Sequence, residues 1–267
     1  MSAFACQEQL IPGDTLERKW EFATAAGYAA IELRGRGGYT FRERLPELKR
    51  AAAAGVVMPT VCVEMSHFFG AFDAELRADA IAQLKSQLSL VAELGGRGVM
   101  TPASYGMFSR RLPPFEPPRG EAGDREVLLN GLIELGEHAA REGVELYLEP
   151  LNRYEDHMVN RLADAAGLIE ETGLDSLRVA ADTYHMNIEE DDPAEALREA
   201  GGYVAHVHVS ESNRHQPGTG HVDWAGVLAA LADIGYDGYL TLECRPRGDP
   251  AEAVAAVPAF LRSQAPA

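Results

Sequence analysis

Short apolar runs alternate with longer segments of helical periodicity along the whole chain. Eight runs have the composition of strands: AFAC, AAIEL, VVMPTVCV, GVM, VELYLE, RVAAD, YVAHVHV and YLTLE. Amphipathic segments such as ELRADAIAQLKSQLSLVAELG follow them, and several end on a glycine suited to a left-handed cap, namely Gly27, Gly55, Gly95, Gly143, Gly173 and Gly235. Eight strand–helix units in 267 residues predict an α/β fold, a (β/α)8 barrel in which residues 1–267 form one domain.

One long segment has neither the period of a helix nor that of a strand. Residues Ser104 to Gly123, SYGMFSRRLPPFEPPRGEAG, follow the fourth strand-like run and are rich in proline and arginine. Loops that follow barrel strands lie over the carboxyl-terminal mouth of the barrel, where function is usually carried. We therefore expect this segment to form a lid or a wall of a substrate site.

Composition narrows the classes of partner. The chain is 46% hydrophobic and carries a net charge of -17, from 41 acidic and 24 basic residues. Such a surface repels nucleic acid and anionic lipid, which disfavours both as partners. No signal-like N-terminus and no run of about 18 apolar residues occurs, so we expect an unexported, cytoplasmic protein. Three cysteines, Cys6, Cys62 and Cys244, have no metal-type spacing, and we expect reduced thiols without an assigned role.

Four strand-like runs finish on polar side chains. In ELYLE, the period-two alternation of a strand places Tyr147 and Glu149 on one face, with Glu149 at the carboxyl-terminal rim. Asp182, His208 and Glu243 occupy the equivalent positions in VAAD, HVHV and YLTLE. The sequence therefore predicts that these four side chains meet at the barrel mouth.

Taken singly, each of these residues has an ordinary interpretation. A lone strand-end carboxylate is usually solvated, and a lone histidine is usually a hydrogen-bonded core residue, as we expect for His206 one layer deeper. Three carboxylates at one rim would repel each other unless a cation neutralised them. Oxygen ligands with a single imidazole suit a divalent ion such as Mn²⁺, Mg²⁺ or Co²⁺, so we predict one metal site.

Five segments around these positions carry a family resemblance. They are EPLNRYE at 149–155, DTYHMNIEE at 182–190, HVHVSESNR at 206–214, PGTGHVDW at 217–224 and LTLEC at 240–244. The chain resembles the xylose isomerase-like TIM barrel superfamily of sugar isomerases and epimerases, and is most similar to the ketose 3-epimerases typified by D-tagatose and D-psicose 3-epimerase.

The resemblance implies a site and a reaction. It implies that Glu149, Asp182, His208 and Glu243 bind one divalent metal, usually Mn²⁺, and that Glu149 and Glu243 act as the acid–base pair. It also implies that Glu155, His185 and Arg214 hold the oxygens of a small sugar substrate, and that the protein is a homodimer or homotetramer.

The chemistry agrees with these roles. Removing a proton next to a ketone leaves an enediolate, whose negative charge a metal ion can stabilise. Epimerisation then requires protonation from the opposite face, and two carboxylates on different strands can flank the substrate. His67 and Glu32, near the ends of earlier strands, are weaker candidates for substrate contacts. Trp224 and His221 are expected to organise a loop, and Asp223 to cap the following helix.

Several alternatives share this barrel and ligand set. Aldose–ketose isomerisation, hydroxypyruvate isomerisation and dehydration of keto-inositols or 3-dehydroshikimate all proceed through an enolate or enediolate. We rank 3-epimerisation of a free ketose first, isomerisation second and dehydration third. An endonuclease IV-like DNA repair activity is disfavoured, because the fourth strand end, GVMTPAS, offers no further histidine and the surface is acidic. A non-catalytic sugar-binding role would fit better if one of the two glutamates were missing.

Overall fold

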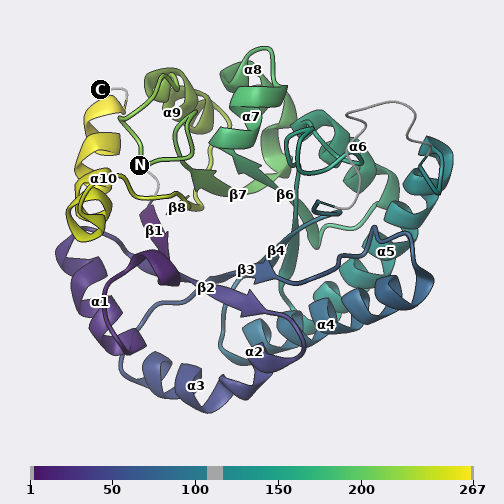
Figure 1. Ribbon diagram of the computed structural model, residues 1–267, viewed down its shortest axis with the longest axis horizontal. Coiled ribbons are helices and arrows are strands. Elements are labelled where there is room, and N and C mark those ends of the chain that lie inside the picture. The colour runs from purple at the N-terminus through teal and green to yellow at the C-terminus, as the bar shows by residue number, and fades with distance from the viewer. Residues whose placement is uncertain (1–2, 107–116, 266–267) are drawn as a thin grey trace.

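Eight parallel strands close into a barrel in the computed structural model, which describes residues 3–106 and 117–265 (Figure 1). Each strand pairs with the next in chain order, and β8 pairs back with β1. The strands are β1 Ala3–Gln7, β2 Ala30–Arg36, β3 Thr60–Glu64, β4 Gly98–Pro102, β5 Glu145–Glu149, β6 Leu177–Asp182, β7 Val204–Val209 and β8 Tyr239–Leu242. The predicted (β/α)8 fold class is confirmed.

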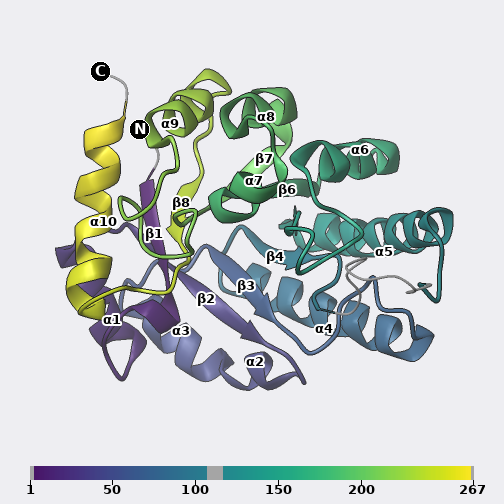
Figure 2. The same ribbon diagram turned by 45° about the horizontal axis from the view of Figure 1, so that its top comes forward.

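Helices form a ring outside the barrel (Figures 1 and 2). They are α1 Leu16–Ala25, α2 Thr40–Glu43, α3 Leu45–Ala53, α4 Ala74–Glu93, α5 Glu121–Glu142, α6 Leu162–Thr172, α7 Thr183–Glu189, α8 Pro193–Ala200, α9 Trp224–Asp233 and α10 Pro250–Gln264, with 3-10 turns at Glu8–Leu10 and Gly201–Tyr203. All the predicted cap glycines have a positive φ, as the left-handed cap requires. Within the described ranges, no helix is long and apolar enough to cross a membrane.

Two elements differ from the sequence prediction in ways that matter for the site. Helix α7 is additional to the eight predicted strand–helix units: it begins directly after Asp182, whose side chain accepts a hydrogen bond from the Tyr184 amide and caps the helix. Strand β2 continues beyond the predicted AAIEL to Arg36, because its second half pairs with β3 from Leu33 onward. Glu32 therefore lies within the strand, not at its end.

The apolar core lies mainly between the barrel and its helices, where side chains such as Ile31, Leu84 and Leu132 are fully buried. Inside the barrel, the buried apolar cluster is small and consists of Met100, Tyr147 and Ala180. The carboxyl-terminal half of the interior is instead occupied by buried polar groups. Burying charges is costly unless they are paired, so this half of the barrel is shaped by function more than by packing.

An ion pair outside the barrel stabilises the turn after β1. Glu8 is buried, accepts two hydrogen bonds from Arg44 at 2.7 and 2.9 Å, and accepts a third from the Arg34 amide at 2.7 Å. Burial alone would raise the pKa of the Glu8 carboxyl, but the Arg44 guanidinium outweighs burial and lowers it.

We expect Glu8→Gln to lower the free energy of unfolding by about 1.5–3 kcal/mol at pH 7, the usual range for a hydrogen bond to a charged group. Because the pKa of Glu8 is depressed by folding, this contribution is present above the unfolded value of about 4.3 and disappears as the pH falls through the folded value. Urea unfolding of both proteins between pH 7 and pH 3 checks this. A difference that does not shrink in acid would contradict the ion-pair explanation.

Candidate metal and catalytic site

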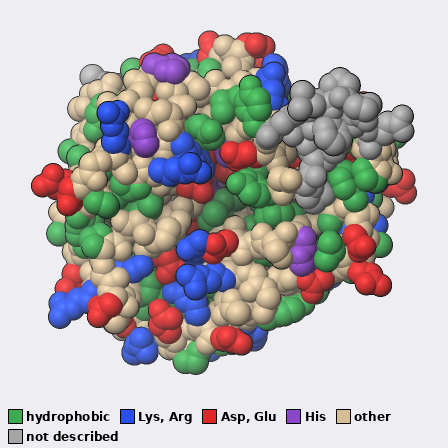
Figure 3. Space-filling view, in the orientation of Figure 1, with side chains coloured by type: hydrophobic (Ala, Val, Ile, Leu, Met, Phe, Trp, Pro, Cys, Tyr) green, Lys and Arg blue, Asp and Glu red, His purple; other side chains and the backbone are tan. Residues whose placement is uncertain are grey.

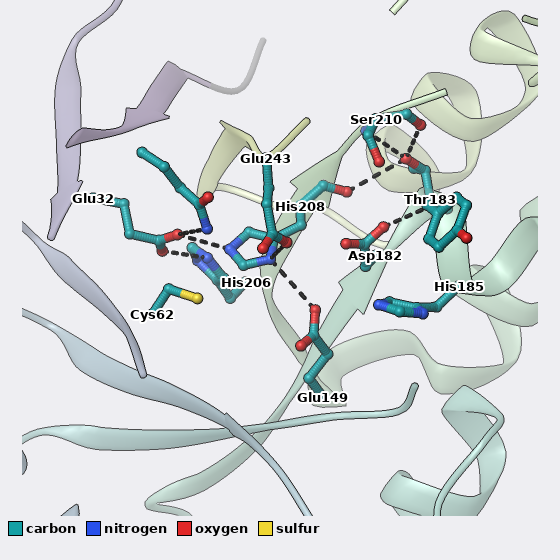
Figure 4. A network of polar contacts seen from close by, with 12 residues as sticks. Glu32, Cys62, Glu149, Asp182, Thr183, His185, His206, His208, Ser210 and Glu243 are labelled. Carbon is teal, nitrogen blue, oxygen red and sulfur yellow. Dashed lines mark hydrogen bonds and ion pairs between the residues drawn. The ribbon is translucent and has the colours of Figure 1, made fainter. Parts of the chain in front are cut away.

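The four predicted strand-end residues meet at one point of the barrel mouth (Figure 4). Glu149 ends β5, Asp182 ends β6, His208 lies in β7, and Glu243 directly follows β8. One potential ligand atom from each lies within 4.8 Å of all the others. His208 Nδ1 is 2.9 Å from Glu243 Oε2 and 3.4 Å from Glu149 Oε1. The inward alternation of the strands therefore brings the predicted cluster together.

This cluster has the properties of a candidate divalent-metal site. Glu149 Oε1 and His208 Nδ1 are buried and lack a hydrogen-bond partner within the part of the chain that the structure describes. Buried polar atoms are rarely left without a partner, so these two atoms indicate a missing ligand. Three carboxylates and one imidazole, without a thiolate, suit a hard or borderline divalent cation.

Arg214 is the counter-ion of the cluster. Its guanidinium lies 2.5 Å from Asp182 Oδ2 and 2.8 Å from Glu243 Oε2, and it stacks over the Tyr184 ring at 4.9 Å. The backbone of Arg214 has a φ of 62°, a left-handed conformation that non-glycine residues seldom adopt. Arg214 was predicted as a substrate contact. The structure places it on the wall of the cavity, with its donors also engaged by two candidate ligands.

The two glutamates at the site have pKa values displaced in opposite directions. Burial raises the pKa of Glu149. Burial also acts to raise the pKa of Glu243, but the charges of Arg214 and His208 outweigh it and hold the pKa well below its usual range. Pairs of carboxyl groups separated in this way are typical of sites in which one group takes a proton and the other gives one.

Beneath the cluster lies a second set of buried polar side chains. Glu32 is fully buried and lies 2.8 Å from both His206 Nε2 and His208 Nε2. The expectation that Glu32 contacts substrate at the mouth is wrong, because β2 continues past it and places it inside the barrel. His206 is buried and stacks on Tyr147 at 5.4 Å, which confirms it as an interior histidine.

A cavity of about 540 Å³ opens above the cluster. Glu149 and Glu243 lie on its wall, together with the predicted substrate contacts Glu155 and His185. The His185 Nδ1 atom accepts a hydrogen bond of 3.0 Å from the Asn152 amide, which fixes the ring against the β5 loop.

The predicted substrate contact of His67 stays a prediction. It is not among the described residues that line the cavity, and its ring nitrogens lie 2.7 Å from Asp79 on α4 and 3.1 Å from Ser66. Those contacts turn the imidazole toward the outer helix, so a substrate contact by His67 gains no support from the structure.

The sequence did not predict several other residues that line the cavity. Gln7, Cys62 and Met100 line the cavity floor and walls, although no motif singled them out. The inward alternation of their strands is the signal that could have found them. The three cysteines are free thiols, and burial raises the pKa of Cys62, so it is a shape-defining wall residue and not a nucleophile.

The loop after β7 is held by Glu211. Its carboxylate accepts hydrogen bonds from Trp224 Nε1 at 2.7 Å and from the Gly218 amide at 2.8 Å, and Asp223 caps α9. The predicted organising role of Trp224 is confirmed. The predicted lid, Ser104 to Gly123, falls largely on residues 107–116, outside the described residues; Tyr105 lines the cavity, and α5 begins at Glu121.

Charges of both signs lie close together near the middle of the face shown in Figure 3. At the cavity edge, Arg34 forms an ion pair with Glu64, which also lines the cavity. Arg36 lies 3.9 Å from the same carboxylate. Basic side chains at this edge are therefore partly neutralised by a neighbouring acid.

Comparison with known proteins agrees with the fold. Residues 20–264 match the family model described as xylose isomerase-like TIM barrel. The chain is 38% identical to 3-dehydro-D-guloside 4-epimerase of Escherichia coli (strain K12), over 96% of this chain and 98% of that protein. It is 33% identical to D-psicose 3-epimerase of Enterocloster bolteae, over 82% of this chain and 73% of that protein. The crystal structure of apo 3-keto-D-glucoside 4-epimerase from E. coli superimposes with a TM-score of 0.92 at 37% identity, covering 98% of this chain and 100% of that one.

A closed parallel barrel with a cluster of carboxylates and one histidine at its mouth, together with these matches, defines the class. The chain belongs to the xylose isomerase-like TIM barrel family. Within that family, its relatives named above are sugar epimerases that act next to a ketone or on a ketose.

Proposed function

We propose that this protein is a divalent-metal-dependent epimerase that inverts a carbon next to the ketone of a sugar. The observation that carries the proposal is that ligand atoms of Glu149, Asp182, His208 and Glu243 lie within 4.8 Å of one another, with Glu149 and Glu243 on the cavity wall. The similarity to sugar epimerases along nearly the whole chain supports the same reaction class.

In this proposal the four residues hold one ion, with Mn²⁺ as the first choice and Mg²⁺ or Co²⁺ as alternatives. Bound there, the cation would supply positive charge where a ketone oxygen gains negative charge during enolisation. The two unpartnered ligand atoms, Glu149 Oε1 and His208 Nδ1, support this assignment.

In this proposal, residues of the chain carry out proton transfer and substrate binding. Glu149 ends β5 and Glu243 directly follows β8, and both lie on the cavity wall. One removes the proton next to the ketone, and the other delivers a proton to the opposite face of the enediolate. Glu155, His185 and Arg214 are assigned to the substrate's oxygens, since all three lie on the cavity wall.

Two substrate classes share this local chemistry. Inversion at C3 of a free ketose is favoured by the strand-end motifs and by the similarity to D-psicose 3-epimerase. Inversion at C4 of a 3-keto glycoside is favoured by the 38% identity to 3-dehydro-D-guloside 4-epimerase, which extends over 98% of that protein. In both, the inverted carbon carries a hydroxyl and neighbours a ketone, so one site serves either. We also propose a cytoplasmic location and a homodimer or homotetramer.

A substrate panel with Mn²⁺ tests the proposal. Free ketoses, 3-keto glycosides, aldoses and their phosphates are each incubated with the protein in deuterated water and followed by NMR. We expect inversion and deuterium incorporation at a carbon next to the ketone in one of the first two classes. Turnover confined to aldose–ketose interconversion, or to loss of water, would replace epimerisation by the corresponding alternative.

A further inference from the structure

Glu32 joins the candidate metal ligand His208 to the interior of the barrel. Its Oε1 atom lies 2.8 Å from His208 Nε2 and accepts a hydrogen bond of 3.2 Å from Gln7 Nε2. Its Oε2 atom accepts a hydrogen bond of 2.8 Å from Thr60 Oγ1 and lies 2.8 Å from His206 Nε2. Both carboxylate oxygens are therefore engaged, each by two polar groups from other strands, and the residue is fully buried (Figure 4).

We infer that Glu32 is a positioning residue that fixes the orientation and tautomer of His208 for metal binding; this inference rests on the proposed function. A carboxylate only accepts hydrogen bonds, so the His208 nitrogen that faces it carries the hydrogen. In a neutral imidazole the other nitrogen then presents its lone pair. That nitrogen is Nδ1, which faces Glu149 and Glu243 in the cluster.

The surroundings of Glu32 support a dedicated role. A carboxylate in the centre of a barrel is costly to bury, and an apolar side chain would fill the same space without that cost. Hydrogen-bonded carboxylates behind a ligating histidine set its ring orientation and raise its basicity as a ligand. The rings of His206 and His208 also contact each other edge to face, with their centroids 4.8 Å apart, so both rings and the Glu32 carboxylate are in mutual contact.

The same carboxylate reaches the cavity wall through Gln7. The Gln7 side chain donates to Glu32, and its Oε1 accepts a hydrogen bond of 2.6 Å from Gln9 Nε2. Both glutamines line the cavity. Glu32 thus fixes which end of the Gln7 amide faces the carboxylate, so one buried group orders a metal ligand and a wall residue together.

Mn²⁺ affinity measured by calorimetry on the metal-free protein tests the inference without using activity. Glu32→Gln keeps the size of the side chain but removes its charge, and one of its two polar atoms becomes an amide nitrogen, which cannot accept a hydrogen bond. We expect a 10- to 100-fold weaker Mn²⁺ affinity in this variant, the usual effect of removing a group that orients a metal ligand. Glu8→Gln is the matched control, because it changes a buried carboxylate outside the barrel, and its Mn²⁺ affinity should equal that of the wild type. Equal affinity in the wild type and Glu32→Gln overturns the inference.

A second measurement does not depend on the folding of Glu32→Gln. Long-range proton–nitrogen NMR of the Mg²⁺-loaded wild type should find the His208 hydrogen on Nε2, with the signal assigned by its loss in His208→Asn. A hydrogen on Nδ1 would overturn the inference. So would two ions bound per chain, because Glu32 with His206 and His208 would then be a second metal site.

These outcomes separate the inference from the proposed function. A wild type that binds Mn²⁺, loses affinity in Glu32→Gln and turns over no substrate of the panel would refute the proposed reaction while supporting the role of Glu32. A wild type that binds no divalent ion would overturn both.

Discussion

Glu149→Gln is expected to stop solvent exchange of the reacting proton in one epimer while leaving exchange in the other, and Glu243→Gln to show the reverse preference. In a two-base epimerase each base faces the proton of only one epimer. Removing one base therefore blocks inversion in both directions but blocks proton removal from only one substrate. We expect a loss of about 10²- to 10⁴-fold in the affected exchange rate, the usual contribution of a general base. Deuterium incorporation into each epimer, followed by NMR, measures this.

Asp182→Asn is the matched control for that experiment, because Asp182 is assigned to the metal but not to proton transfer. This variant should slow exchange in both epimers alike. Metal content is measured in all three variants, so that loss of the ion is not mistaken for loss of a base. If the two glutamate variants retain metal and lose exchange equally in both epimers, a single base serves both faces and the two-base mechanism is wrong. Wild-type deuterium incorporation only at C1 or C2 would indicate an isomerase.

The candidate cluster could be predicted from the sequence because it depends on local alternation. In β5, Tyr147 and Glu149 point into the barrel simply because they are two residues apart. The same count places Asp182 and His208, and the carboxyl ends of parallel barrel strands always meet at one mouth. The strands and the main helices could be predicted for the same reason, because the hydrophobic period of each can be recognised within its own segment.

What the sequence could not supply depends on contacts between distant strands. Glu32 and His208 are 176 residues apart, and their contact across the interior depends on the closure of the barrel. The alternation of β2 alone predicts that the Glu32 side chain points into the barrel, but it does not predict the contacts with two histidines. Helix α7 was missed because its start is fixed by the Asp182 cap, whose geometry is decided by the strand that precedes it.

The direction of the His67 side chain could not be predicted for a related reason. Its position after β3 predicted a side chain at the barrel mouth, but His67 Nε2 lies 2.7 Å from Asp79 Oδ2 on α4. Side-chain direction in a loop is decided by the nearest strong partner, which a sequence does not reveal.

Metal removal is expected to abolish turnover and to lower the melting temperature. The carboxylates of Glu32, Glu149 and Asp182 are buried and that of Glu243 is partly buried; Arg214 is the guanidinium in contact with Asp182 and Glu243. Without a divalent ion, negative charge in this part of the barrel exceeds the positive charge of that arginine, and repulsion destabilises the fold. An ion that binds only the folded state adds stability by mass action, about 2.7 kcal/mol at a free concentration a hundred times its dissociation constant.

Thermal unfolding with and without a chelator, followed by addition of Mn²⁺, Mg²⁺ or Co²⁺, measures this effect. Glu149→Gln sharpens the test, because it removes one of the repelling charges as well as a ligand. The chelated variant should therefore melt no lower than the chelated wild type, while its Mn²⁺-dependent rise in melting temperature should be smaller. If the cluster held no ion, chelation would leave the wild-type melting temperature and turnover unchanged, and Glu149→Gln would alter stability by the same amount with or without Mn²⁺. That pattern would show that the cluster is stable without a bound ion and would contradict the metal assignment.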